Sequence, residues 1–106
     1  MNFIINFKDQ TSTALVAPTW SEAAAYAEGT GKEIQGISQL INVTFVLNVV
    51  GSDNCYQVSL KNTTTSLLSN YYVFDNDFQS LNTWITSQSN TEVRNISLSQ
   101  RNYVSI

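Results

Sequence analysis

An internal repeat of one strand pattern constrains this chain more than any other feature of its sequence. Residues 3–8 and 56–61 both alternate apolar and mixed positions, and both end in lysine. A period of two places every second side chain on the same face of a β-strand. The apolar faces are formed by Phe3, Ile5 and Phe7 in the first segment and by Tyr56, Val58 and Leu60 in the second. We therefore expect two equivalent strands, each with one face in a hydrophobic core.

A second apolar run and a helix start follow each of these strands. The runs cover residues 14–17 and 71–74. In the first half Thr19 can cap a helix, with Glu22 three residues later in a capping-box pattern. Asp77 takes the equivalent place in the second half.

Short helices are expected near residues 20–28 and 78–87. Each carries a single apolar stripe, which consists of Trp20, Ala23, Ala24 and Ala27 in the first helix and of Phe78, Leu81, Trp84 and Ile85 in the second. Gly29 and Gly31 are expected to end the first helix, and the polar residues 87–90 the second.

Two more strands complete each half. Residues 33–38 and 92–97 share the spacing Glu-apolar-x-x-Ile, and the final strands are expected at 43–50 and 102–106. The order in each half is therefore strand-strand-helix-strand-strand.

This order defines repeat 1 over about 1–50 and repeat 2 over about 51–106. Short strands with compact turns, and helices too short for frequent parallel crossovers, predict an α+β fold with antiparallel sheets. One repeat alone buries too little apolar surface to offset its conformational entropy. We therefore expect the tandem repeats to form a single compact domain over residues 1–106.

The strand at 43–50 has apolar side chains on both faces. A central strand covered on both sides has this pattern, so we place it at the junction of the repeats. The alternative is an edge strand that pairs with another subunit.

The charge pattern excludes several classes of partner. The five basic residues are scattered singly in a chain of net charge −3, whereas nucleic-acid binding needs clustered cations. The eight carboxylates are too separated for the acidic face of a DNA mimic. No apolar run of about 18 residues and no leader pattern occurs, so we expect a cytosolic product without a membrane partner.

No pattern for catalysis stands out. Histidine is absent, which removes the commonest general base and metal ligand. Cys55 has no imidazole to activate it, and we interpret it as a small buried residue. The segment Asp75-Asn76-Asp77 resembles the opening of a calcium loop, but helix capping explains it better than a loose cation site. The sequence therefore predicts a non-enzymatic protein with no catalytic, cofactor-binding or metal-binding residues.

Two other segments have a ligand interpretation beside a structural one. A stacking platform for a sugar or base is one interpretation of four aromatic residues, but their spacing favours a place in the core; they are Tyr71, Tyr72, Phe78 and Trp84. The segment from Gly29 to Lys32 is faintly similar to a phosphate loop. It follows a helix rather than preceding one, which indicates a helix C-cap.

The segment VAPTWSEAA at residues 16–24, followed by Glu33-Ile34-x-x-Ile37, is similar to small strand-strand-helix-strand proteins encoded by tailed bacteriophages. The duplicated module and the composition rich in Asn, Ser and Thr resemble virion accessory proteins, particularly those of the crAss-like phages of gut bacteria. This resemblance implies a structural role in the virion, as an auxiliary protein that decorates or stabilises the capsid or acts at the portal vertex.

The resemblance also implies partners and a location. The partner would be a larger phage structural protein of the capsid or the portal connector, with self-association as a second contact. The chain would be made in the cytoplasm of the bacterial host and carried in the virion. The alternative is a small phage-encoded binding module that inhibits or redirects a host factor. The sequence indicates no cofactor, no nucleic acid and no membrane in either case.

Overall fold

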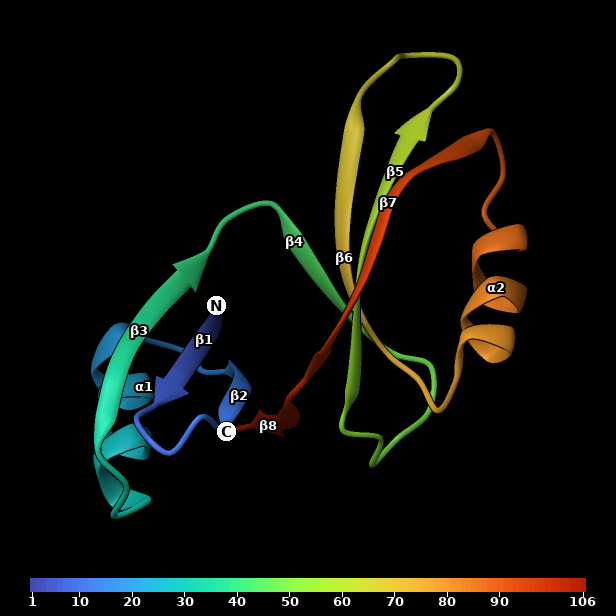
Figure 1. Cartoon of the computed structure of the whole chain (residues 1–106). Helices are drawn as coiled ribbons and strands as arrows, with labels where there is room; N and C mark the ends of the chain where they lie inside the picture. The colour runs from blue at the N-terminus through green and yellow to red at the C-terminus, as the bar shows by residue number, and fades with distance from the viewer. The chain divides into compact units, whose positions relative to one another are not determined.

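The computed structural model describes all 106 residues, with eight strands and two helices in the order predicted for two repeats (Figure 1). Repeat 1 contains β1 (Asn2–Phe7), β2 (Ser12–Val16), α1 (Trp20–Gly29), β3 (Ile34–Leu40) and β4 (Val43–Leu47). Repeat 2 contains β5 (Asn54–Asn62), β6 (Leu68–Phe74), α2 (Phe78–Thr86), β7 (Thr91–Gln100) and β8 (Asn102–Ser105). The prediction of an α+β fold built from two strand-strand-helix-strand-strand repeats is confirmed.

The strands form two four-stranded sheets, each in its own compact unit. Unit 1 comprises residues 1–41 and 100–106, and its sheet has the order β3-β1-β2-β8. Unit 2 comprises residues 42–99, and its sheet has the order β4-β6-β5-β7. The last strand of each repeat therefore belongs to the unit that the other repeat mainly builds. The compact units and the sequence repeats consequently have different boundaries.

Both sheets are mixed, so the expectation of antiparallel sheets is wrong in one respect. The pairs β1–β2, β1–β3 and β5–β6 are antiparallel, whereas β2–β8 and β4–β6 are parallel. Short turns join the antiparallel pairs β1–β2 and β5–β6, but β4 and β8 each follow a strand of the other unit in the chain. No hairpin turn fixes the direction of these two strands.

The strand β4 corrects a second expectation, because it lies at an end of its sheet and not at a covered centre. Its strand bounds are Val43–Leu47, and Val50 is exposed beyond them. Both faces are apolar because each has its own apolar neighbour. Val46 packs against the helix-side core of unit 2, and Phe45 stacks on Tyr72 from the opposite face.

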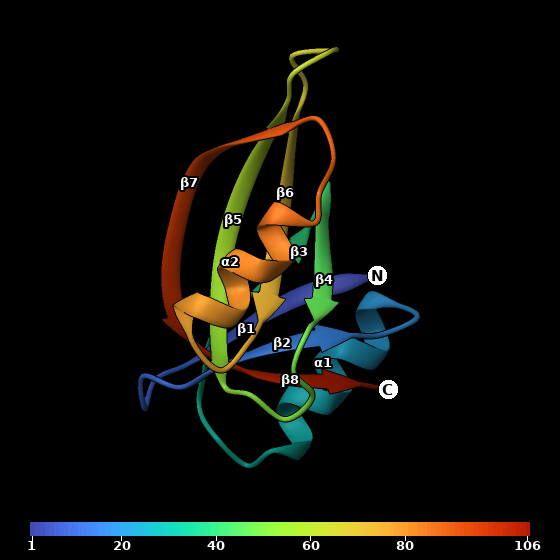
Figure 2. The ribbon, with the colours of Figure 1, turned by 90° about the vertical axis from the view of Figure 1, so that its right-hand side faces the viewer.

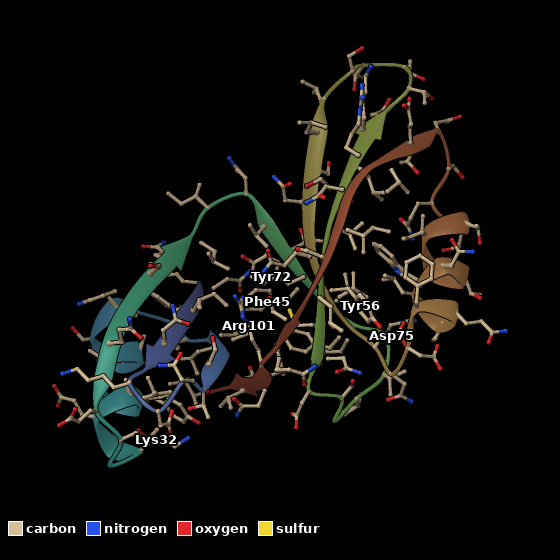
Figure 3. The ribbon with its side chains drawn as sticks, in the orientation of Figure 1. Lys32, Phe45, Tyr56, Tyr72, Asp75 and Arg101 are labelled. Carbon is tan, nitrogen blue, oxygen red and sulfur yellow. The ribbon has the colours of Figure 1, made fainter.

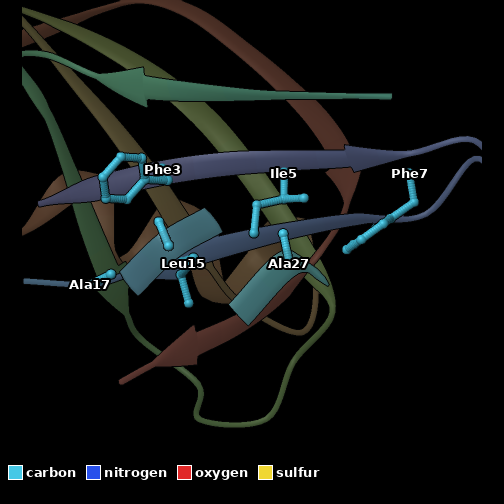
Figure 4. Close-up of a cluster of buried hydrophobic side chains, with 7 residues drawn as sticks. Phe3, Ile5, Phe7, Leu15, Ala17 and Ala27 are labelled. Atoms are coloured by element: carbon cyan, nitrogen blue, oxygen red, sulfur yellow. The ribbon is translucent and has the colours of Figure 1, made fainter. Parts of the chain in front are cut away.

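Each unit has one core between its sheet and its helix. In unit 1 it contains Phe3, Ile5, Phe7, Leu15, Ala17, Ala23 and Ala27 (Figure 4). In unit 2 it contains Tyr56, Val58, Leu60, Val73, Leu81 and Ile85, and Figure 2 shows α2 lying across β5 and β6. The predicted apolar strand faces are confirmed.

The two cores divide their volume differently between sheet and helix. Unit 1 places two phenylalanines on β1 opposite the alanines of α1. Unit 2 keeps a large side chain, Tyr56, at the first of these positions but has the smaller Val58 and Leu60 at the next two, and its helix supplies Leu81 and Ile85. Close packing requires this compensation, since a core tolerates neither voids nor overfilling.

The helices begin as predicted. Thr19 is the N-cap of α1, and its hydroxyl accepts a hydrogen bond from the backbone N–H of Glu22 at 3.1 Å. Asp77 is the N-cap of α2, and its carboxylate accepts one from the N–H of Ser80 at 2.8 Å. Each cap satisfies one backbone donor that the first helical turn leaves without a partner.

Candidate functional site

Cys55 and the acidic segment 75–77, both predicted to have structural roles, lie among groups that hold the fold together. The Cys55 side chain is fully buried in β5, opposite Phe74 of β6, so the interpretation as a small buried residue is confirmed. Helix capping is confirmed for Asp77. Asp75 has a different role, since it is fully buried and lies before the cap. It is labelled in Figure 3.

The Asp75 carboxylate organises the loop after β4. One oxygen accepts the side-chain amide of Asn48 at 2.6 Å, and the other accepts the backbone N–H of Asn76 at 2.8 Å. The backbone carbonyl of Asp75 accepts the Ser52 hydroxyl at 2.6 Å, and the Asn54 amide donates to the Asn76 carbonyl at 2.8 Å. A buried carboxylate is costly without such donors, so these bonds tie the β4–β5 loop to the start of α2.

No three His, Cys, Asp or Glu side chains lie close enough together to hold a metal ion. Neither helix is long and apolar enough to cross a membrane.

The segment from Gly29 to Lys32 forms the predicted helix end. The helix α1 ends at Gly29, and Gly31 has a positive φ of 75° while its N–H donates to the Glu28 carbonyl at 3.2 Å. Lys32 turns back to the β1–β2 turn, where its ammonium lies 3.3 Å from the Asp9 carboxylate and 5.2 Å from the centre of the Phe7 ring.

The Asp9 carboxylate lies in the turn between β1 and β2 and accepts hydrogen bonds from Thr11. The hydroxyl of Thr11 and then its backbone N–H hold the pKa of Asp9 below its ordinary value, and the charge of Lys32 acts in the same direction. This exposed cluster fixes the turn between β1 and β2.

The aromatic residues divide between core and surface. Tyr71 and Trp84 meet edge to face at 5.3 Å and pack against the core of unit 2, so the core interpretation is confirmed for both. Tyr72 stacks on Phe45 across the parallel β4–β6 pair, with ring centres 5.8 Å apart. Both side chains are labelled in Figure 3. The core interpretation is wrong for Phe78, which is 55% exposed.

Trp20 corrects the same expectation in unit 1, since it is 49% exposed. Trp20 and Phe78 are both the first residue of their helix, directly after the N-cap. Side chains in a helix lean toward its N-terminus, so a side chain at this position projects beyond the helix and past the core. One edge of Trp20 still meets Phe3, at 5.9 Å between ring centres.

Each unit thus presents a half-exposed aromatic at the same place in its fold. Of the exposed large apolar side chains, Trp20 and Phe78 are the aromatic ones, and aromatic residues dominate the energetics of protein interfaces. We take this pair, the helix-start aromatics, as the candidate functional site. Sequence reasoning placed both in the core, although the repeat itself aligns them directly after equivalent caps.

Two shallow hollows lie on unit 1. A groove of about 590 Å³ beside α1 is lined by Pro18, Glu22, Ala25, Tyr26 and Ile106. A smaller cleft of about 340 Å³ is lined by Asn6, Phe7, Gln10, Thr11, Gln35 and Gly36.

The outer strands β3 and β7 end their respective sheets at equivalent positions. Most side chains of β7 are exposed, including Val93 and Leu98. Edge strands of this kind can extend the sheet of a neighbouring protein. Comparison with known protein families, curated proteins and solved structures finds no match to this chain.

Proposed function

We propose that this chain is a structural, non-enzymatic auxiliary protein of a tailed-phage virion. In this role it decorates or stabilises the capsid, or serves as an accessory at the portal vertex, through contacts with a larger phage structural protein. The observation that carries the proposal is the duplicated pair of helix-start aromatics, Trp20 and Phe78. A shell of identical subunits offers the same contact many times, and a protein with two equivalent anchors suits such a surface.

The energetics of these anchors fit a contact site. An aromatic side chain buries roughly 150–250 Å², so covering an exposed half removes about 100 Å² from water. At about 25 cal/mol per Å², each contact contributes about 2.5 kcal/mol, or roughly a 60-fold gain in affinity. Two anchors on one chain also raise the local concentration of the second contact once the first has formed.

The surroundings of the reactive side chains support the non-enzymatic part of the proposal. Cys55 is buried beside Phe74, whereas a cysteine nucleophile needs a partly exposed, electropositive site. The oxygens of Asp75 and Asp77 accept hydrogen bonds that fix a loop and a helix start. Both carboxylates therefore have a role in holding the fold together.

Quantitative mass spectrometry of purified particles from the encoding phage tests the proposal. We expect many copies of the chain per particle. A chain that is abundant in infected cells and missing from particles would overturn the virion role and would favour the alternative, a module that binds a host factor.

Substitutions at the anchors test the contact itself. Trp20→Ala and Phe78→Ala should each lower the number of copies retained per particle, and the double variant should lower it most. Leu68→Ala is the matched control, because Leu68 is also an exposed apolar residue but lies on β6. Equal retention of all these variants would exclude the helix-start aromatics as the contact.

A further inference from the structure

The sheet of unit 1 is completed by a strand from the second repeat. β8 pairs with the outer edge of β2 in parallel, with Thr13 opposite Asn102 and Val16 opposite Ser105. The Thr13 hydroxyl donates to the Asn102 side chain at 2.6 Å, and the N–H of Ile106 donates to the Val16 carbonyl at 2.9 Å. Val104 packs against the core of unit 1. The edge of β2 is therefore a binding site for one short strand in one register.

The link that brings β8 to the edge of β2 is short. Residues up to Ser99 belong to unit 2, β7 ends at Gln100, and Arg101 alone separates it from β8 in unit 1. A strand that completes the sheet of the other unit through so short a link can complete the same sheet in another copy when the link adopts a different conformation. The backbone and side-chain partners that β2 offers are the same in every copy.

The corresponding strand of repeat 1 is held differently. β4 is followed in the chain by β5 of the same sheet, and the loop between them is tied by the Asn48–Asp75 hydrogen bond. Removing β4 from its sheet would therefore disturb the loop network as well.

We propose that β8 exchanges between copies, so that the β2 edge of one chain binds residues 102–105 of a second copy in the same parallel register. Because β8 makes the same contacts with β2 in the monomer and in the exchanged dimer, the concentration of the chain sets the equilibrium between the two forms. A tether of this kind gives an effective concentration on the order of 1 mM, so exchange becomes substantial when the chain itself approaches that concentration. This inference is independent of the proposed virion role.

Cross-linking between two full-length variants tests the exchange, both in a Cys55→Ala background. One chain carries Thr13→Cys and the other Asn102→Cys, and the two are unfolded, mixed, refolded together at about 1 mM and oxidised. Thr13 is only 5% exposed, so a cysteine at this position meets a second chain only when that chain supplies β8. We expect covalent heterodimers at ten or more times the yield of the control pair.

The control pair is Ser59→Cys with Asn70→Cys, again on separate chains. Ser59 and Asn70 lie opposite each other on β5 and β6, with a side-chain hydrogen bond of 2.7 Å that matches the one between Thr13 and Asn102. These two strands are hairpin neighbours within unit 2 and are not exchanged. A yield from the β2–β8 pair no higher than from this pair would overturn the proposal.

A second measurement decides the matter if the cysteine variants fail to refold. The unsubstituted chain is refolded at about 10 µM and at about 1 mM, and its mass is measured by light scattering. A dimer fraction that rises with concentration supports exchange. A monomer at both concentrations would overturn the proposal.

Discussion

The core of unit 2 depends on Leu81, and its replacement by alanine gives a quantitative test of the packing. Leu81 is fully buried on α2, among Tyr56, Val58 and Leu60 of β5. The substitution removes three carbon atoms, and about 0.8 kcal/mol per buried carbon gives a transfer loss of about 2.4 kcal/mol. The cavity that remains adds to this loss, so we expect the free energy of unfolding to fall by about 3 kcal/mol.

Urea unfolding followed by tryptophan fluorescence measures this change, because each unit contains one tryptophan. Trp84 packs near the core of unit 2, and Trp20 lies against Phe3 in unit 1. Backgrounds with a single Trp20→Phe or Trp84→Phe substitution therefore report on one unit at a time. For a chain of this length a loss of about 3 kcal/mol corresponds to a fall of roughly 15 °C in Tm.

Leu68→Ala is the control, because Leu68 is exposed on β6 and its truncation should change stability by less than about 0.5 kcal/mol. A loss of free energy of unfolding below about 1 kcal/mol for Leu81→Ala would refute the packing argument, because truncation of a close-packed leucine to alanine costs about 2–5 kcal/mol. An equal loss from both substitutions would refute it as well.

Three further changes test local features of the fold. Thr19→Ala should destabilise the chain by about 1 kcal/mol through loss of the α1 cap, whereas Thr19→Ser should retain most of it, as measured by thermal unfolding. Gly31→Ala should cost about 1 kcal/mol because Gly31 has a positive φ of 75°, and Gly36→Ala, where an added Cβ meets no atom within 4 Å and φ is not positive, is its control in the same assay. The pKa of Asp9 is lowered in the folded chain, so its stabilising contribution is present above the unfolded value and is lost as the pH falls through the folded value. Wild type should therefore be more stable than Asp9→Asn near neutral pH, and the difference should shrink as the pH falls below about 4. Urea titrations at several pH values measure this difference, with Asp53→Asn as the control. The same pH dependence for both variants would contradict the role assigned to Asp9.

Local pattern was sufficient to predict the elements of each repeat. The period of two in residues 3–8 and 56–61 gave the correct inward faces, and the caps at Thr19 and Asp77 gave the correct helix starts. These features depend on residues within a few positions of one another. The same holds for the turn at Gly31, where only the local backbone is involved.

The sheet that β4 and β8 each join could not be predicted in this way. An apolar pattern on both faces of residues 43–50 fits a central strand, and it fits equally an edge strand whose two faces meet different neighbours, as Phe45 and Val46 do. Which sheet a strand joins depends on partners far away in the sequence, and periodicity carries no information about them. The exposed helix-start aromatics were missed because a helical stripe does not record where the underlying sheet ends.

The pairing of β2 with β8 also governs how the chain reaches its native state. Thr13 and Asn102 are hydrogen-bonded across 89 positions of sequence. Contacts at such separations raise the contact order, and a high contact order slows folding because a long loop must close before the contact stabilises anything. During synthesis, β1, β2, α1 and β3 leave the ribosome well before residues 102–105 exist. The first unit to emerge is therefore the last to acquire its fourth strand, and the rate of that final step is set by the ordering of the 58 residues from 42 to 99 that separate its two parts.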